Sequence, residues 1–455
     1  MSTMPAYYGL ALLALLAAPS ASAPAQEDTR PSGLRIRAEH RTRVERLERD
    51  FRVSPADGLT AVVLRTVVAV DVGSPGLRAG VELADSRAWA DDFAPLNTTH
   101  VNTFELLSAY VGSSRSGLLA PGDVASLRLG RLTLDRGGRR LVARNNFRNT
   151  INAFTGLDLA WTTPSRALRA FAVLPVRQRP SDAAALADND ARIDTENPDA
   201  LFWGVHWESS VGGDGARVEA YVVGLSERDG EVASSNRRLV TPGVRLFRGD
   251  APGRVDFELE AMLQVGTSRA SSSASDVRDL SHRAFAGHAS AGYRIQGAWS
   301  PRLVLQYDYA SGDRNPGDGR NDRFDPLFGA RAFELNATGF YGAFARSNIS
   351  SPGVRLEAAP HARVDLMVDY RPYWLASDRD AWTTAGLRDA TGDSGGFVGH
   401  QIEWRVRGRP IPGSVTLDVG GAALLRGGFA REAEGGRAGS AAWFYGQVAV
   451  TGAWR

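Results

Sequence analysis

Long, strict alternation of apolar and polar side chains is the feature that most limits how this chain can fold. Residues 255–265 read VDFELEAMLQV, in which odd positions are apolar and even positions are polar, apart from Met262. Successive side chains of a β-strand point to opposite faces, so the pattern predicts a strand with one apolar and one polar face. Soluble strands usually have about 5–6 residues, whereas a tilted strand that crosses a bilayer needs about 9–11. The length of this segment fits the membrane-spanning class.

The same alternation recurs along the chain, and the connections between the predicted strands alternate in length. This template gives about eighteen strands, of which those near residues 101–111 and 351–357 are the weakest. Connections of a few residues, such as 73–76, alternate with long polar ones, such as 135–153 and 311–350. Short periplasmic turns and long external loops are typical of outer-membrane barrels. An even number of strands would also place both chain ends on the short-turn side.

The cost of placing charge in lipid decides which face of each strand points outward. Asp256, Glu258 and Glu260 share one face of the 255–265 strand. At mid-membrane an outward charge costs roughly 2–4 kcal/mol for Arg and somewhat less for Asp or Glu, so these carboxylates should face an aqueous lumen. Closing the sheet also removes unpaired edges, which lipid does not tolerate. The sequence therefore predicts an all-β fold, a transmembrane antiparallel up-and-down β-barrel.

The first 25 residues have the features of a secretory signal peptide. An apolar run at Tyr8–Ala18 is too short to span a bilayer and is followed by small residues. Cleavage is expected after Ala25, with Ala23 as the alternative, although the run is preceded by no Arg. Residues 26–455 are then expected to form a single barrel domain, which reaches the outer membrane of a Gram-negative cell through the periplasm.

Composition excludes several kinds of site. The chain has no Cys, so disulfides, thiolate metal ligands and a Cys nucleophile are excluded. Its 53 basic residues are all Arg, but the net charge is only +2, so nucleic acid is not an expected partner. The histidines lack ligand spacing, and no G-x-S-x-G nucleophile elbow stands out, so no metal site, cofactor or enzymatic activity is expected.

One loop could hold calcium through clustered oxygens. Residues 312–325 contain four aspartates, namely Asp313, Asp318, Asp322 and Asp325. Carboxylate oxygens are the ligands that calcium prefers, but Gly317 stands where the EF-hand spacing needs a ligand. A solvated loop is the preferred interpretation.

The most basic part of the chain is residues 128–150, which contain seven Arg and only one acidic residue, Asp135. The apolar parity changes within it, from Leu127 and Leu129 to Leu132 and Leu134. The change falls at Gly130 and predicts a β-bulge that re-aims Arg131. Because so little acid is nearby in the sequence, part of this positive charge is expected to stay unpaired.

Three sets of segments, in this order, resemble the alginate export family of outer-membrane proteins. They are Gly130-Arg131 with residues 139–150 and 154–159; residues 307–313 (YDYASGD) with 324–328 and Asn348-Ile349; and residues 399–404 with the Gly-rich run near 426–428. The resemblance spans most of residues 33–455. It implies an eighteen-stranded barrel whose Arg-rich lumen selects an anionic polyuronate, together with periplasmic export partners.

Candidate pore-lining residues follow from parity and from this resemblance. Parity places four arginines toward the lumen: Arg78, Arg245, Arg355 and Arg405. The matching segment adds Arg131, Arg144 and Arg148. Five carboxylates are predicted to face the same lumen, namely Glu82, Asp158, Asp308, Asp365 and Glu403. The alternative for any one Arg is a structural ion pair that merely lines the wall.

Two classes of function remain open. The preferred one is an anion-selective outer-membrane channel, either for export of an alginate-like polysaccharide or for uptake of small anions by a porin. The other is a secreted all-β enzyme that acts on polysaccharide, built as a sandwich or a β-helix. A sandwich would show shorter strands and no strict order of short and long turns.

Overall fold

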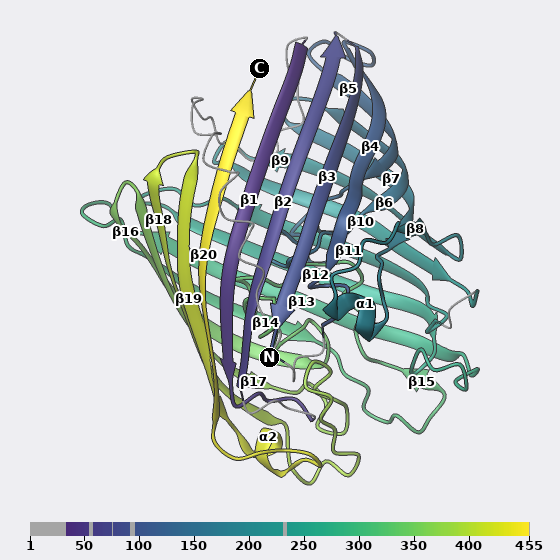
Figure 1. The fold of residues 1–455 in the computed structure, drawn as a ribbon, viewed down its shortest axis with the longest axis vertical. Coiled ribbons are helices and arrows are strands. Elements are labelled where there is room, and N and C mark those ends of the chain that lie inside the picture. Colours follow the sequence, from purple (N-terminus) through teal and green to yellow (C-terminus); the bar gives the residue numbers. More distant parts are fainter. Residues whose placement is uncertain (1–32, 54–57, 75, 92–95, 231–233, 455) are drawn as a thin grey trace.

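A closed antiparallel barrel forms the whole of the described molecule (Figure 1). The computed structural model describes residues 33–53, 58–74, 76–91, 96–230 and 234–454, and the predicted signal peptide lies outside these ranges. Two of the twenty strands, β8 (Thr195–Glu196) and β15 (Arg320–Asn321), have only two residues, and the other eighteen form the wall. The predicted architecture and strand number are confirmed.

The wall strands have 9 to 17 residues, which suits tilted strands that cross a bilayer. Their bounds, in chain order, are β1 (Gly33–Glu48), β2 (Gly58–Ser74), β3 (Leu77–Ala90), β4 (Asn102–Ser116), β5 (Val124–Leu132), β6 (Phe154–Thr162), β7 (Arg166–Arg177), β9 (Ala200–Val211), β10 (Ala216–Glu227), β11 (Arg238–Arg248), β12 (Val255–Ser268), β13 (Leu280–Arg294), β14 (Arg302–Ala310), β16 (Ile349–His361), β17 (Val364–Trp374), β18 (Phe397–Ile411), β19 (Val415–Arg426) and β20 (Ser440–Trp454). The two weakest predicted strands are complete strands, β4 and β16.

Pairing of β1 with β20 closes the barrel. The ladder runs from Ile36 opposite Trp454 to Glu48 opposite Ala442, so neither strand is left as an open edge. The start of β1 and the end of β20 therefore lie at the same end, where the short turns also lie. The long connections 133–153, 178–199 and 311–348 leave the opposite end. This is the predicted alternation of turn lengths.

Helices contribute little to the molecule. Both α1 (Ala183–Ala187) and α2 (Gly428–Glu432) have five residues and lie in long connections. No helix among the described residues has the length and apolar character needed to cross a membrane.

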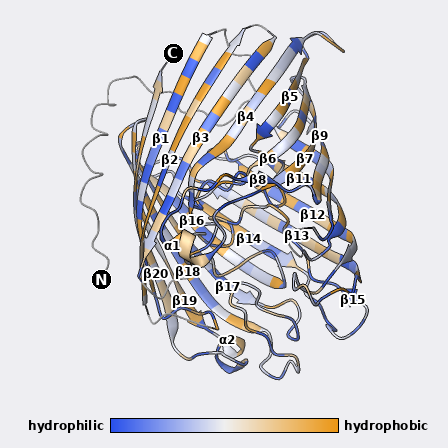
Figure 2. Cartoon of the chain, turned by 45° about the vertical axis from the view of Figure 1, so that its right-hand side comes forward, coloured by the Kyte–Doolittle hydropathy of each residue, from blue (hydrophilic) through white to orange (hydrophobic). Residues whose placement is uncertain are grey.

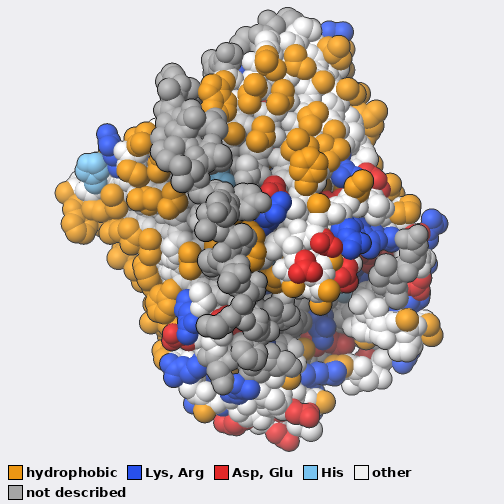
Figure 3. All heavy atoms as spheres, in the orientation of Figure 1, with side chains coloured by type: hydrophobic (Ala, Val, Ile, Leu, Met, Phe, Trp, Pro, Cys, Tyr) orange, Lys and Arg blue, Asp and Glu red, His pale blue; other side chains and the backbone are white. Residues whose placement is uncertain are grey.

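Apolar side chains cover the outer face of the barrel. Along β12, Val255, Leu259 and Leu263 are 48%, 51% and 44% exposed, whereas Asp256 and Gln264 on the other face are 5% and 0% exposed. Figure 2 shows the same alternation of hydrophilic and hydrophobic residues along neighbouring strands. In Figure 3 apolar side chains spread over the short-turn half of the wall, and charged ones gather toward the long-loop end. The apolar face is the one that meets lipid.

The predicted bulge at Gly130 is wrong. The ladders of β5 with β4 and with β6 pass through Gly130 without a register shift. Leu132 has the same inward parity as Gly130, and both Leu132 and Leu134 are 1% exposed. The apolar residues change face because the lumen is packed with apolar side chains at this depth. Met262 is inward and 3% exposed for the same reason.

Cysteine labelling tests the register of β12 directly, because the chain contains no native Cys. A water-soluble thiol reagent should label Glu258→Cys, whose side chain faces the lumen. A lipid-soluble reagent should label Leu259→Cys, whose side chain is 51% exposed on the outer face. Heat-modifiable electrophoretic mobility verifies that each variant is folded. Reversed labelling of the two positions would show that the register is inverted.

Candidate permeation path

Two long loops lie inside the barrel and narrow its lumen. These inserted loops are residues 133–153, between β5 and β6, and residues 311–348, between β14 and β16. They hydrogen-bond to each other: the Ala143 amide donates to the Phe328 carbonyl at 3.1 Å, and the Ala330 amide donates to the Arg139 carbonyl at 2.8 Å. The two loops therefore act as one structural unit within the wall.

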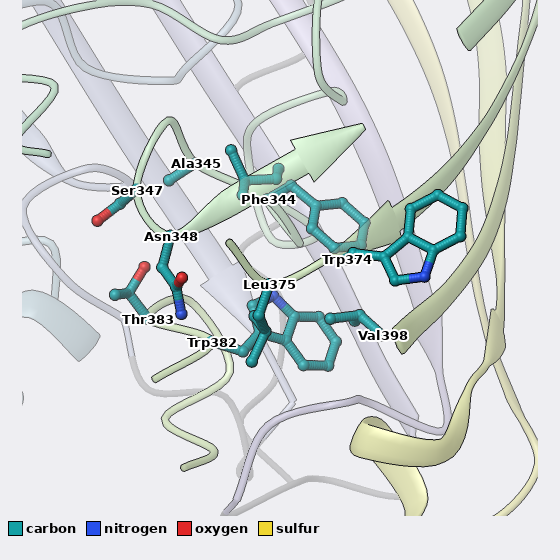
Figure 4. A pocket seen from close by; sticks show the side chains of 10 residues that line it. Phe344, Ala345, Ser347, Asn348, Trp374, Leu375, Trp382, Thr383 and Val398 are labelled. Atoms are coloured by element: carbon teal, nitrogen blue, oxygen red, sulfur yellow. The ribbon is translucent and has the colours of Figure 1, made fainter. Parts of the chain in front are cut away.

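Aromatic side chains pack the inserted loops against the inner wall. Phe147 of the first loop contacts Tyr445 of β20, with ring centroids 5.4 Å apart. Phe344 of the second stacks on Tyr373 of β17 and, at 5.5 Å, on Trp382 of the connection between β17 and β18. Figure 4 shows Phe344 and Trp382 beside Trp374 and Leu375 around a small cavity. That cavity has a volume of about 10 Å³, which is at the lower limit for one water molecule. It is therefore a packing gap and not a ligand site.

Arginines of β1 and β2 hold the first inserted loop by its backbone. Arg41 donates to the carbonyl oxygens of residues 146, 147 and 148 at 2.8–3.3 Å. Arg65 donates to the carbonyls of residues 146 and 148, at 2.9 and 3.2 Å, and Arg43 donates to that of Phe147 at 2.7 Å. Hydrogen bonds from a charged donor are stronger than neutral ones, so this set fixes the loop firmly.

Sequence reasoning did not single out these three anchoring arginines, although part of the signal was present. In β1 the odd positions from 35 to 45 are all charged, and their even-numbered neighbour Val44 is 46% exposed on the outer face. A row of six inward charges predicts a partner inside the lumen. The identity of that partner, a loop backbone, depends on the fold and is not encoded locally.

Four predicted pore-lining arginines lie on the inward face of the wall. Arg245 contacts Glu258 at 2.8 Å, Arg355 contacts Asp369 at 2.8 Å, and Arg405 contacts Asp418 at 2.6 Å. Arg78 has the parity opposite to that of the lipid-facing Leu77, which is 64% exposed. Their contact with a solute stays a prediction.

Arg131 does not face the lumen, contrary to the sequence-based interpretation. It shares the outward parity of Leu129, which is 54% exposed, because no bulge re-aims it. Its guanidinium binds the Glu196 carboxylate at 2.6 Å. Glu196 belongs to β8, in the 178–199 connection that also bonds to the start of β4 through Asp194 and Asn102 at 2.9 Å. Arg131 therefore fastens this connection to the wall.

The expected surplus of unpaired charge in residues 128–150 is mostly absent, because acids distant in sequence supply the partners. Arg144 binds both carboxylate oxygens of Glu82, at 2.5 and 2.9 Å. Arg136 pairs with Asp158. Arg140, only 2% exposed, pairs with three carboxylates, those of Glu258, Glu260 and Glu334. Counting acids within the segment could not reveal pairs that close across the barrel.

Arg148 is the exception in this segment, and Arg331 of the second inserted loop resembles it. Arg148 donates to the Thr150 carbonyl at 3.2 Å and to the Asn152 side-chain oxygen at 2.6 Å, and Arg331 donates to the Phe344 carbonyl at 3.0 Å. Both side chains are half-buried, and neither forms an ion pair with any residue that the structure describes. They come from different inserted loops. Sequence reasoning named Arg148 and missed Arg331.

The surroundings of these two arginines penalise their charge. Burial, opposed only by the charge of Glu105, lowers the pKa of Arg148 to about 10. Burial, followed by the charges of Arg52 and Arg148, lowers the pKa of Arg331 to about 10. Both groups remain cations at neutral pH. An anion between them would relieve the mutual repulsion, so they form the best candidate anion site in the described lumen.

Alkaline pH should weaken anion selectivity, because both guanidinium groups lose their charge as pH rises through about 10. An ordinary arginine stays charged above about pH 12, and the chain has no Lys that would titrate in this range. Reversal potentials measured from about pH 7 to 11 check this. A variant with Arg148→Gln and Arg331→Gln serves as the control, because tyrosine ionisation affects both proteins equally. An equal fall of selectivity in the two proteins would contradict the assignment.

The aspartates of the 312–325 loop mostly have protein partners. Asp325 accepts from Arg237 at 2.8 Å, Asp322 accepts from Arg320 at 2.9 Å, and Asp318 accepts from the Arg320 backbone amide at 2.7 Å. Throughout the described ranges no group of three His, Cys, Asp or Glu side chains is placed to hold a metal ion. The geometry gives no support to a calcium site.

Solved structures with the same fold are outer-membrane porins. The barrel is similar to a BenF-like porin from Pseudomonas fluorescens Pf-5, with a TM-score of 0.59, 10% identity and coverage of 93% of this chain and 100% of the porin. It is also similar to OpdK from Pseudomonas aeruginosa, with a TM-score of 0.55, 13% identity and coverage of 92% and 99%. OccD3 (OpdP) from the same organism gives a TM-score of 0.57 at 11% identity, with coverage of 93% and 92%.

Sequence comparison identifies the family more specifically. No curated protein gives a significant match to the chain. The alginate export family model, however, matches residues 33–444, which is nearly the whole described barrel. The resemblance seen in the sequence is thereby confirmed, and the barrel is an outer-membrane channel. This chain belongs to the alginate export family.

Proposed function

We propose that the channel conducts an anionic solute, and that an alginate-like polyuronate is the main candidate. The pair Arg148 and Arg331 is the observation that carries this proposal. Two half-buried cations without carboxylate partners, contributed by two loops that narrow the lumen, create a positive field in the permeation path. Fixed positive charge in a narrow pore concentrates anions and repels cations.

The chemistry of arginine suits a chain of carboxylated sugars. Guanidinium groups bind carboxylates through two parallel hydrogen bonds, so two such groups can engage successive uronate units. The paired arginines elsewhere in the lumen already have carboxylate partners and would hold a passing anion less strongly. Weak binding at a single step allows the solute to leave as easily as it enters.

Uptake of small anions is the second candidate. One OpdK structure from Pseudomonas aeruginosa was solved with vanillate, and that barrel aligns with 92% of this chain at a TM-score of 0.54 and 14% identity. The dense packing of the inserted loops also favours a small solute. A passive pore has no intrinsic direction, so export and uptake differ only in where the solute is supplied.

Planar bilayer recording tests the proposal. Under a potassium chloride gradient, the reversal potential of the wild-type channel should show preference for chloride. A uronate oligomer should reduce the current more than a neutral oligosaccharide of equal length. Block by small carboxylates alone would favour the second candidate. Preference for potassium would refute the positively charged path, because the inward carboxylates would then dominate the field.

A further inference from the structure

The outer wall carries a basic patch at its long-loop end. Arg238 on β11 and Arg283 on β13 are both exposed and share the outward face with their lipid-facing neighbours. In the ladders Arg238 lies opposite Thr267, and Arg283 lies opposite Val265, so the two arginines are two strands and two residues apart. Ordinary sheet spacing then separates their Cα atoms by about 12 Å. Two long side chains at that spacing can converge on one anionic group.

These two arginines lack the partners that other outward arginines have. None of the side-chain hydrogen bonds or ion pairs of the described residues involves the guanidinium group of Arg238 or Arg283. By contrast, Arg87 contacts Asp85 at 3.0 Å, and Arg46 lies 3.6 Å from Glu48, also on the outer face near the long loops. The positive charge of Arg238 and Arg283 is therefore not neutralised within the described protein.

The position of the patch points to a lipid. Directly toward the membrane centre lie apolar side chains on the same face, with Phe285 48% and Leu263 44% exposed. Phe285 also stacks on Tyr309, with ring centroids 5.1 Å apart, as aromatic side chains do at a membrane interface. An outward Arg is costly at mid-membrane and costs little near the interface. On this face the apolar side chains lie toward the membrane centre and the two arginines lie toward the long-loop end. The acyl chains and the phosphate group of a lipid have the same order.

We propose that Arg238 and Arg283 bind the phosphate group of a lipid in the outer leaflet of the outer membrane. The long loops of a barrel of this family face the exterior, so the patch meets that leaflet. The hydroxyls of Thr267 and Ser281, which alternate with the arginines in the ladders, offer further donors to phosphate oxygens. The inference is independent of the solute that passes through the lumen.

Lipid binding to the full, detergent-solubilised chain tests this site by native mass spectrometry. Lipid A with both phosphates should bind, and lipid A stripped of phosphate should bind much more weakly. The variant Arg238→Gln with Arg283→Gln should bind the phosphorylated lipid about 25-fold more weakly, since each Arg near an anionic surface contributes about fivefold in affinity. The matched control, Arg46→Gln with Arg87→Gln, should retain binding.

Several outcomes would overturn the proposal. Equal binding by the wild type and by the Arg238/Arg283 variant would show that the patch does not contact the lipid. Equal binding of the stripped lipid would show that acyl chains alone are recognised. Displacement of the lipid by an equal concentration of inorganic phosphate would indicate a site for free anions. Heat-modifiable mobility controls for folding, which these unpartnered side chains should not affect.

Discussion

Replacement of both Arg148 and Arg331 by Gln should lower the chloride-over-potassium permeability ratio of the channel about three- to tenfold. At an effective dielectric of about 20, a unit charge about 8 Å from an ion contributes about 2 kcal/mol. Salt in the lumen screens part of this energy, and 1.4 kcal/mol corresponds to a factor of ten. Neither guanidinium forms an ion pair with a described carboxylate, and Glu105 only partly opposes the charge of Arg148, so removing both charges should change the field strongly. Reversal potentials in a salt gradient measure the ratio.

The control for this experiment is Arg139→Gln in the same inserted loop. Arg139 is 47% exposed along its side chain and pairs with Asp135 at 2.9 Å, so its charge is already neutralised. The substitution removes one positive charge, half of what the double variant removes, and should change selectivity little. Uronate block should weaken in the double variant and persist in the control. If the control changed selectivity as much as the double variant, total lumen charge would govern the channel, without a special site.

Sequence reasoning succeeded wherever one periodicity governed the structure. Alternation along 255–265 gave the correct faces for Asp256 and Leu259, since a misplaced register would put charge into lipid. Alternating turn lengths gave the correct topology and the side on which β1 starts. These features are local and repeat along the chain, and the membrane imposes them on every strand.

Sequence reasoning failed where protein, and not water, fills the lumen. The parity argument at Gly130 assumed that inward residues are polar, so buried Leu132 and Leu134 were interpreted as a change of face. They are inward because inserted loops supply an apolar surface there. Arg131 was consequently assigned to the wrong side of the wall. The rule that inward-facing side chains are polar holds only for the part of a barrel that water fills.

In the candidate site, too, one residue could be predicted from a local sequence pattern and the other could not. Arg148 lies in a segment whose Arg content is visible in the sequence, and it was named for that reason. Arg331 lies in a loop without periodicity, and the interaction of its charge with that of Arg148 depends on contacts between the loops, such as that between Ala330 and Arg139. Partners are also remote in sequence: Arg140 and Glu334 are separated by 194 positions. No local pattern encodes such a pair.

Arg140→Ala should release the inserted loops and enlarge the channel. Arg140 is 2% exposed, and its guanidinium joins the first inserted loop to Glu258 and Glu260 of β12 and to Glu334 of the second loop. Removing one partner of a buried ion pair costs about 3–5 kcal/mol, because the remaining charges stay buried without compensation. Glu260 would keep only the Tyr221 hydroxyl, at 2.5 Å. The loops should then leave their docked position while the closed wall persists.

Single-channel recording should show larger and noisier currents for Arg140→Ala, with a normal heat-modifiable barrel. Arg139→Ala, at the adjacent position, is the matched control, since an exposed ion pair contributes only about 0–1 kcal/mol and its loss should leave conductance unchanged. Combining Arg140→Met with Glu260→Gln removes a buried charge together with its partner and should restore part of the docking. Wild-type conductance in Arg140→Ala would show that the ion pairs of Arg140 are not needed to hold the loops. Aromatic packing and the hydrogen bonds from Arg41, Arg43 and Arg65 to the loop backbone would then be sufficient. The position of the loops, and with it the width of the path, would then depend on the wall of β1 and β2 instead of β12.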